Sequence, residues 1–165
     1  MDAFVQPLYE LADFDAIIRQ LKKPGIVQVS GCLDSQKAHF TNGLLREFPF
    51  RLIVAENDLK AKAFYEDFRL YDPEVLYYPA RDLIFYQADI HGNLLTRQRI
   101  QVLRALLERE EVTIVTSIDS CLDCLVPLAV WKEKVIKIRN DSEIDLDRMK
   151  RHLVELGYEL SLIHI

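Results

Sequence analysis

The sequence has no long hydrophobic run, and its apolar stretches are as short as VTIV at residues 112–115. A helix that crosses a bilayer needs about 20 apolar residues, so no transmembrane segment is predicted. The opening residues, MDAFVQPLYELADF, carry acids and lack a basic cluster. We therefore expect no signal peptide.

Cysteines and basic residues are also scarce. There are three cysteines, and only Cys121 and Cys124 are close in sequence. An odd, small number of cysteines predicts a reducing compartment, and hence the cytoplasm. Lys plus Arg number 21 against 26 Asp plus Glu, which gives a formal net charge of −5. Because phosphate contacts need cations, this balance disfavours a general nucleic-acid coat and leaves only local basic patches.

The composition is otherwise that of a globular domain, with 50% hydrophobic and 28% charged residues in a chain of 165. Four apolar segments are predicted to be strands: 26–30, 50–55, 75–79 and 112–117. Helical spacing of apolar residues separates them over 35–48, 58–71 and 94–109, and one or two short helices are expected in 2–22. This order predicts an α/β fold, a parallel sheet with helices on both faces.

The pattern changes near Pro127, which places a predicted domain boundary between residues 1–127 and 128–165. In the second part, KVIKIRN at 134–140 alternates as a strand does, and residues 145–158 form an amphipathic pattern that Gly157 closes. This part is too short to bury a core of its own. We interpret it as the first strand and helix of a smaller α+β domain, with a final stretch that fits neither element.

Residues 30–38, SGCLDSQKA, sit where a strand-to-helix turn would carry a phosphate-binding loop. The pattern G-x-x-x-x-G-K-[ST] cradles phosphates with backbone N–H groups, and its hydroxyl holds magnesium. Gly31 and Lys37 match it, but Gln36 replaces the second glycine and Ala38 cannot bind a metal. The predicted degenerate loop comprises Gly31, Ser35, Gln36, Lys37 and Ala38. The ordinary interpretation, a turn capped by Asp34 or Ser35 with Lys37 in solvent, is favoured over live nucleotide binding.

A nucleotide hydrolase also needs an acidic residue at a strand tip to hold magnesium. The apolar run at 112–115 is followed by Thr116 and Ser117, and Asp119 comes too late to serve. Two separate parts of the hydrolase machinery are therefore missing, so we predict no catalytic residues in this segment.

Other polar signals are ambiguous. Cys121 and Cys124 have the spacing of metal or redox ligands, but a zinc site needs a second ligand pair, so we predict no metal site and interpret both as small apolar residues near a strand end. Four arginines along 94–109 (Arg97, Arg99, Arg104 and Arg109) are interpreted as a surface salt-bridged face, with Arg104 paired to Glu108.

A second basic group lies beyond residue 130. A solvated face is the first interpretation because acids interleave with these residues, and a partner surface is the second. The residues of that predicted surface are Trp131, Lys134, Lys137, Arg139, Arg148 and Arg151.

The order of these features resembles a known family. The degenerate loop at 30–38, the YYPARDLIFY segment from residue 77, the R-x-x-x-L-x-x-L helix and the Ser-x-x-Ser turn of TSIDSCLDCLVP resemble the N-terminal UvrB-like module of the bacterial transcription-repair coupling factors (Mfd). UvrB itself shares the layout but keeps an intact G-K-T loop and a longer tyrosine-rich hairpin. This chain has Gln36 and Ala38 in place of that G-K-T loop, and its aromatic segment is shorter. Both differences favour the coupling factor over UvrB.

The resemblance implies a RecA-like (P-loop NTPase-like) domain without catalysis, which recruits UvrA by imitating UvrB. The segment itself would use no cofactor, whereas motor domains elsewhere in the parent protein would use ATP and magnesium to act on DNA and stalled RNA polymerase. No membrane partner is implied. The alternative is a fragment of a UvrB-type ATP-dependent DNA helicase with a working nucleotide site.

Overall fold

The computed structural model describes residues 3–80, 89–136, 138, 141, 143–156 and 158. The chain forms two compact units, Met1–Cys124 and Leu125–Ile165. The division falls close to the boundary expected from the sequence near Pro127. The assignment of the second unit to a UvrA-interaction domain stays a prediction.

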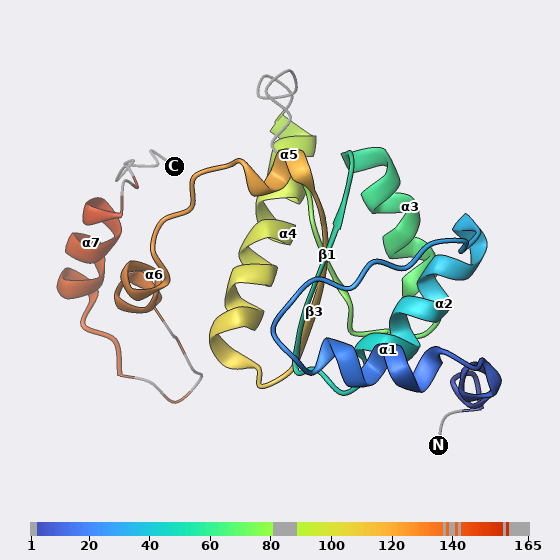
Figure 1. The fold of residues 1–165 in the computed structure, drawn as a ribbon. Coiled ribbons are helices and arrows are strands. Elements are labelled where there is room, and N and C mark those ends of the chain that lie inside the picture. Colours follow the sequence, from blue (N-terminus) through green and yellow to red (C-terminus); the bar gives the residue numbers. More distant parts are fainter. Residues whose placement is uncertain are drawn as a thin grey trace. The chain divides into compact units, whose positions relative to one another are not determined.

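A three-stranded parallel sheet organises the first unit (Figure 1). Its strands are β1 (Phe50–Ala55), β2 (Leu76–Tyr78) and β3 (Val112–Ser117), in the spatial order β1-β3-β2. β1 pairs with β3 from Phe50↔Val112 to Ala55↔Ser117, and β2 pairs with β3 from Leu76↔Ile114 to Tyr78↔Thr116. Every residue of β3 is buried, as expected for the central strand of a parallel sheet covered on both faces.

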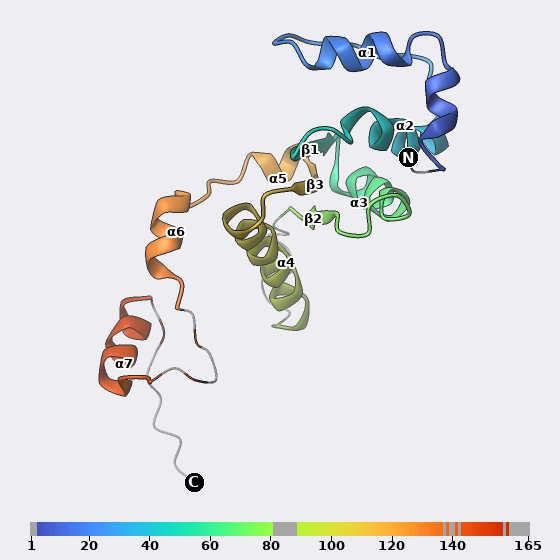
Figure 2. The same cartoon turned by 90° about the horizontal axis from the view of Figure 1, so that it is seen from below.

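Helices cover the two faces of this sheet unequally (Figure 2). On one face lie α2 (Asp34–Leu45) and α3 (Asp58–Phe68), and on the other lies α4 (Asp89–Glu108). Ala61 and Phe68 of α3 pack with Tyr77 and Val115 of the strands. On the opposite face, strand residues pack with α4 in a second cluster: Leu76, Tyr78, Val112, Ile114, Val102 and Ala105. The fold class is thus α/β, consistent with a RecA-like domain, as predicted.

The N-terminal residues add a third small core against α2. They form the 3-10 helix η1 (Gln6–Glu10) and α1 (Phe14–Leu21), as the sequence suggested for residues 2–22. Val5, Leu8, Phe14 and Ile18 are buried there together with Leu44 of α2. No helix within the described part of the chain is long and apolar enough to cross a membrane.

The strand predicted over residues 26–30 is not formed. These residues are extended but pair with no strand, and the Ile26 side chain is 99% exposed. Both edges of β3 already carry hydrogen-bonded neighbours, so this segment has no place beside the central strand. Val27 and Val29 instead line a groove with Ile17, Leu21 and other residues of α1 and α2. Val27 is half-buried and Val29 is 40% exposed, so these alternating apolar residues line a surface groove and do not belong to a sheet.

The second unit contains α6 (Leu128–Lys134) and α7 (Leu146–Glu155). The strand predicted over 134–140 is absent from its described residues: Lys134 ends α6, and residues 135, 136 and 138 are neither helix nor strand. A strand needs a hydrogen-bonded partner, and the described part of this unit offers none. No residue whose exposure is described in this unit is buried, in line with the expectation that it is too small for a core.

The side of β1 that faces away from α2 and α3 remains uncovered. Phe50, Leu52 and Val54 alternate along this strand with exposed fractions of 59%, 61% and 45%. Arg51 is the single charged residue of the strand. It lies near Asp72 and Glu111, so it does not expose a charge along the edge of the sheet. An apolar edge strand without an exposed charge is a site of unwanted strand pairing.

Replacing Leu52 with Lys is therefore expected to reduce self-association of the chain, with a change in folding free energy within about 0.5 kcal/mol. Sedimentation velocity over a range of concentrations measures the association. Leu70→Lys is the matched control, because Leu70 is 78% exposed and lies after α3, away from the strand. Equal association of the wild type and both variants would contradict this interpretation of the edge.

Candidate functional site

The predicted phosphate loop forms the start of α2. Gly31 has a positive φ of 89°, a conformation that favours glycine and turns the chain into the helix. The helix begins after Leu33, whose backbone N–H donates to Gln36 Oε1 at 3.2 Å. The cap is therefore supplied by Gln36, and not by Asp34 or Ser35 as the sequence suggested. Gln36, which replaces the second glycine of the phosphate pattern, therefore stabilises the start of its own helix.

Lys37 forms an ion pair with a neighbouring residue in the same turn. Its Nζ lies 2.6 Å from Asp34 Oδ1 in an exposed ion pair. The hydrogen bond and charge of Lys37 lower the pKa of Asp34, and Asp34 in turn raises the pKa of Lys37, so both groups are charged at neutral pH. Ser35 is exposed, whereas Ala38 is buried against the sheet core. The loop begins a helix as expected, but the strand expected before it is not formed, and Lys37 pairs with Asp34 on the surface.

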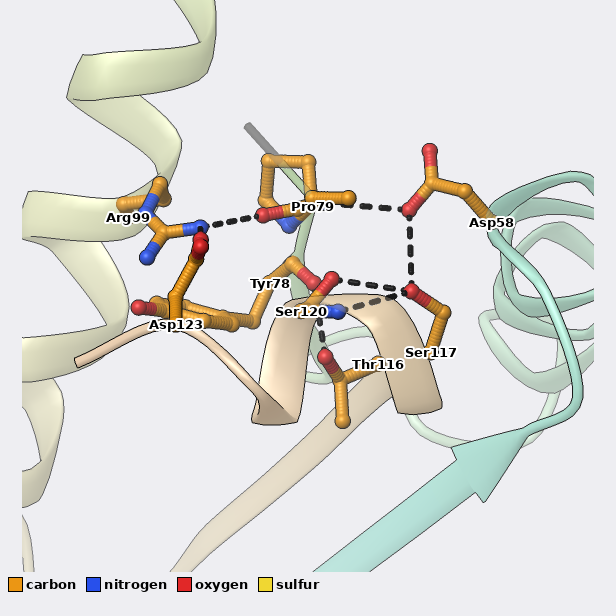
Figure 3. Close-up of polar contacts among 9 residues, drawn as sticks. Asp58, Tyr78, Pro79, Arg99, Thr116, Ser117, Ser120 and Asp123 are labelled. Carbon is orange, nitrogen blue, oxygen red and sulfur yellow. Dashed lines mark hydrogen bonds and ion pairs between the residues drawn. The ribbon is translucent and has the colours of Figure 1, made fainter. Parts of the chain in front are cut away.

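A polar network, shown in Figure 3, closes the carboxyl end of the sheet, where open α/β folds bind ligands. Asp58, the first residue of α3, accepts from the backbone N–H of Ala80 at 3.1 Å and from Ser117 Oγ at 3.5 Å. Ser117 also caps the short helix α5 (Ile118–Cys121) by accepting from the Ser120 N–H, and the two serine hydroxyls lie 2.9 Å apart. Side chains at the strand tip are thus bonded to one another.

Tyr77 adds a further contact to the same carboxyl end. Its hydroxyl donates to the backbone carbonyl of Asp58 at 3.4 Å. Burial, together with the hydrogen bond and charge of Asp58, raises the pKa of Tyr77. The phenol therefore stays protonated at neutral pH and acts as a hydrogen-bond donor.

Arg99 of α4 is the charged centre of this end of the sheet. Its Nη1 donates to the Pro79 carbonyl at 2.8 Å and lies 2.8 Å from Asp123 Oδ2. The guanidinium stacks 4.3 Å from the centre of the Tyr78 ring, and the side chain is only 8% exposed. Thr116 Oγ donates to the Tyr78 carbonyl at 2.9 Å. One buried cation therefore joins α4, the end of β2 and the last residues of the first unit (Figure 3).

The interpretation of the arginine helix as a surface face is correct for Arg104 and wrong for Arg99. Arg104 is exposed and pairs with Glu108 at 2.8 Å, as predicted. Arg99 is buried because the covered stripe of α4 runs through Arg99, Val102 and Leu103. The i, i+3, i+4 spacing of these residues was the sequence signal that could have located Arg99.

Four of the six residues of the predicted partner surface lie on the helices of the second unit. Trp131 is half-buried and Lys134 exposed on α6, and Arg148 and Arg151 are exposed on α7. Lys137 and Arg139 lie outside the described residues. The side chains with known placement thus present three cations to solvent, as either a solvated face or a partner surface would.

The carboxyl end of the sheet offers little for catalysis. Asp58 and Asp123 are engaged by donors from their own unit. Among the residues that the structure describes, no three His, Cys, Asp or Glu side chains gather as metal ligands would. The contacts of Asp58 and Asp123 join elements of the first unit to one another.

Comparison with known proteins gives relatives of two kinds, although no protein-family model matches the chain. The transcription-repair-coupling factor of Bacillus subtilis is 29% identical over 166 residues, which cover 98% of this chain and 14% of that protein. The UvrABC system protein B of Treponema denticola is 29% identical over 143 residues, covering 87% of this chain and 20% of that protein. A transcription-repair-coupling factor of Staphylococcus epidermidis is 26% identical over 80% of this chain.

The homologues of this chain are therefore transcription-repair-coupling factors and UvrABC system B proteins, consistent with the UvrB-like module that the sequence suggested. The chain spans about a fifth or less of the length of each of these three relatives.

Replacement of Arg99 with Met should destabilise the first unit by about 1–3 kcal/mol, because the buried Pro79 carbonyl and Asp123 lose a charged donor. Urea unfolding followed by circular dichroism measures the change. Arg104→Met is the control: it removes an exposed ion pair and is expected to cost less than about 1 kcal/mol. Equal effects of the two substitutions would show that Arg99 is not the centre of the network.

Proposed function

We propose that this chain is a non-catalytic recruitment segment of a transcription-repair coupling factor, which links removal of stalled RNA polymerase to nucleotide excision repair. The alignment with the Bacillus subtilis transcription-repair-coupling factor over 98% of the chain is the observation that carries this proposal. The similarity to UvrABC system B proteins over as much as 91% of the chain supports the accompanying idea of mimicry. The first unit would act as a scaffold, and the longer protein would supply the motor.

The absence of catalysis is inferred from how the polar groups are used. Lys37 is paired with Asp34, Gln36 caps its own helix, and the strand tip carries Ser117 in place of an acid. A triphosphate would have to displace the Asp34 carboxylate, and a metal would find Ala38 where a hydroxyl is needed. ATP and magnesium would therefore serve other parts of the parent protein. DNA and RNA polymerase are likewise proposed as partners of those parts.

UvrA is the proposed partner of this chain, in agreement with the resemblance to UvrB. The exposed cations of α6 and α7 are the proposed contact surface, because they are the charged residues of the predicted surface that face solvent, and exposed charge guides association with an oppositely charged surface. The free cysteines Cys32, Cys121 and Cys124 fit the expected cytoplasmic location.

Binding to purified UvrA should weaken by roughly tenfold or more when Lys134, Arg148 and Arg151 are replaced together with Gln, since each removes a cation from the interface. Biolayer interferometry at two salt concentrations measures this effect, which should shrink at high salt. A variant with Arg69, Arg104 and Arg109 replaced by Gln removes the same number of cations from the first unit and serves as the matched control. Equal loss in both variants would point to net charge as the cause.

Titration of the chain with ATP and magnesium separates the proposal from its alternative, a helicase fragment with a working nucleotide site. We expect no binding at micromolar nucleotide, and no difference between the wild type and Lys37→Ala, in isothermal titration calorimetry. Micromolar affinity that Lys37→Ala abolishes would establish the alternative. Lys60→Ala is the control, because Lys60 pairs with Glu56 in a comparable exposed position outside the loop.

A further inference from the structure

The two cysteines at the end of the first unit are on the surface, contrary to the expectation that they are small apolar residues packed near a strand. Cys121, the last residue of α5, and Cys124, the last residue of the unit, are both exposed and free, whereas Cys32 is half-buried. Exposed thiols have little packing value, so their presence three positions apart calls for another explanation.

The backbone between them turns. The Leu122 N–H donates to the Asp119 carbonyl at 3.3 Å, and the Asp123 N–H donates to the Ser120 carbonyl at 3.4 Å. A bend at Asp123 follows this turn, so the chain changes direction between the two cysteines. A disulfide needs a Cβ separation of about 3.5–4.5 Å. Closure therefore requires the Cβ atom of Cys124 to come within this range of the Cβ atom of Cys121.

Hydrogen bonds and an ion pair hold the residues around Cys121, whereas Cys124 lies outside the helix. Asp123, between the cysteines, is fixed by the buried Arg99, and Ser117 and Ser120 anchor the start of α5. Cys124 lies outside any helix or strand, and the division between the units follows it directly. The movement needed for closure is therefore at Cys124, which belongs to no helix or strand.

We propose that Cys121 and Cys124 form a dithiol site that a small disulfide oxidant, such as glutathione disulfide, closes to an intramolecular disulfide. The thiolate of one cysteine attacks a sulfur of glutathione disulfide, its S–S bond breaks, and one glutathione leaves as the thiol. The second cysteine then attacks the resulting mixed disulfide and releases the second glutathione. Two protein thiols are oxidised, one external disulfide is reduced to two thiols, and the two protons pass to the released glutathiones. This site is independent of the proposed recruitment function.

The test treats the reduced full chain with about 0.1 mM glutathione disulfide and follows intact mass and disulfide-mapped peptides. A thiol held one turn away has an effective concentration in the millimolar range or above. The wild type should therefore lose two hydrogen masses and carry a Cys121–Cys124 link, with the closed form exceeding the glutathione adduct by roughly tenfold.

Single variants supply the controls. In Cys121→Ser and Cys124→Ser, each made in a Cys32→Ser background, one thiol remains without a partner, so each should accumulate a stable glutathione adduct with no loss of two hydrogens. Cys32→Ser should close as the wild type does. Persistent adducts on Cys121 or Cys124 of the wild type, a link that involves Cys32, chains joined by intermolecular disulfides, or no reaction at all would each overturn the proposal.

Discussion

The burial of β3 between two helical layers is the constraint on which the first unit depends. This strand supplies hydrogen bonds to both neighbours, and each of its side chains is covered. Its two faces separate the core into a cluster with α2 and α3 and another with α4. Because the strands are parallel, their carboxyl ends meet at one edge, and the polar groups that follow them must be satisfied together.

Arg99 bonds the polar groups at this edge on the α4 side, and Asp58 bonds those on the α3 side. The arginine bonds the end of β2 and the approach to the unit boundary, and the aspartate bonds the end of β3 and the segment after β2. In a nucleotide-binding member of this fold class, the same edge would hold phosphates and a metal. Here its polar groups are used for internal bonds, which is the physical basis for proposing a scaffold and not a catalyst.

Sequence patterns predicted most of the helices and strands, but not which other segments each of them contacts. β1 and β3 were predicted to the residue, and α2, α3 and α4 to within a few residues, because strong apolar periodicity and short turns bound them. The segments 26–30 and 134–140 also alternate like strands. Their alternation could not reveal whether a partner strand would pair with them, since pairing depends on residues distant in the chain. The spacing predicts a degenerate phosphate loop at the start of α2, and this loop and its lost chemistry stay predictions.

The sequence by itself determined the α/β class, the parallel order of elements and the kinship with coupling factors and UvrABC system B proteins, because these follow from local periodicity and from residue identity along the chain. Only the tertiary structure decided that Arg99 is buried, that Lys37 is paired with Asp34, that one side of β1 is bare, and that Cys121 and Cys124 are exposed. Such facts depend on which helix covers which strand. That choice is made by packing between segments far apart in the chain, which no local pattern contains.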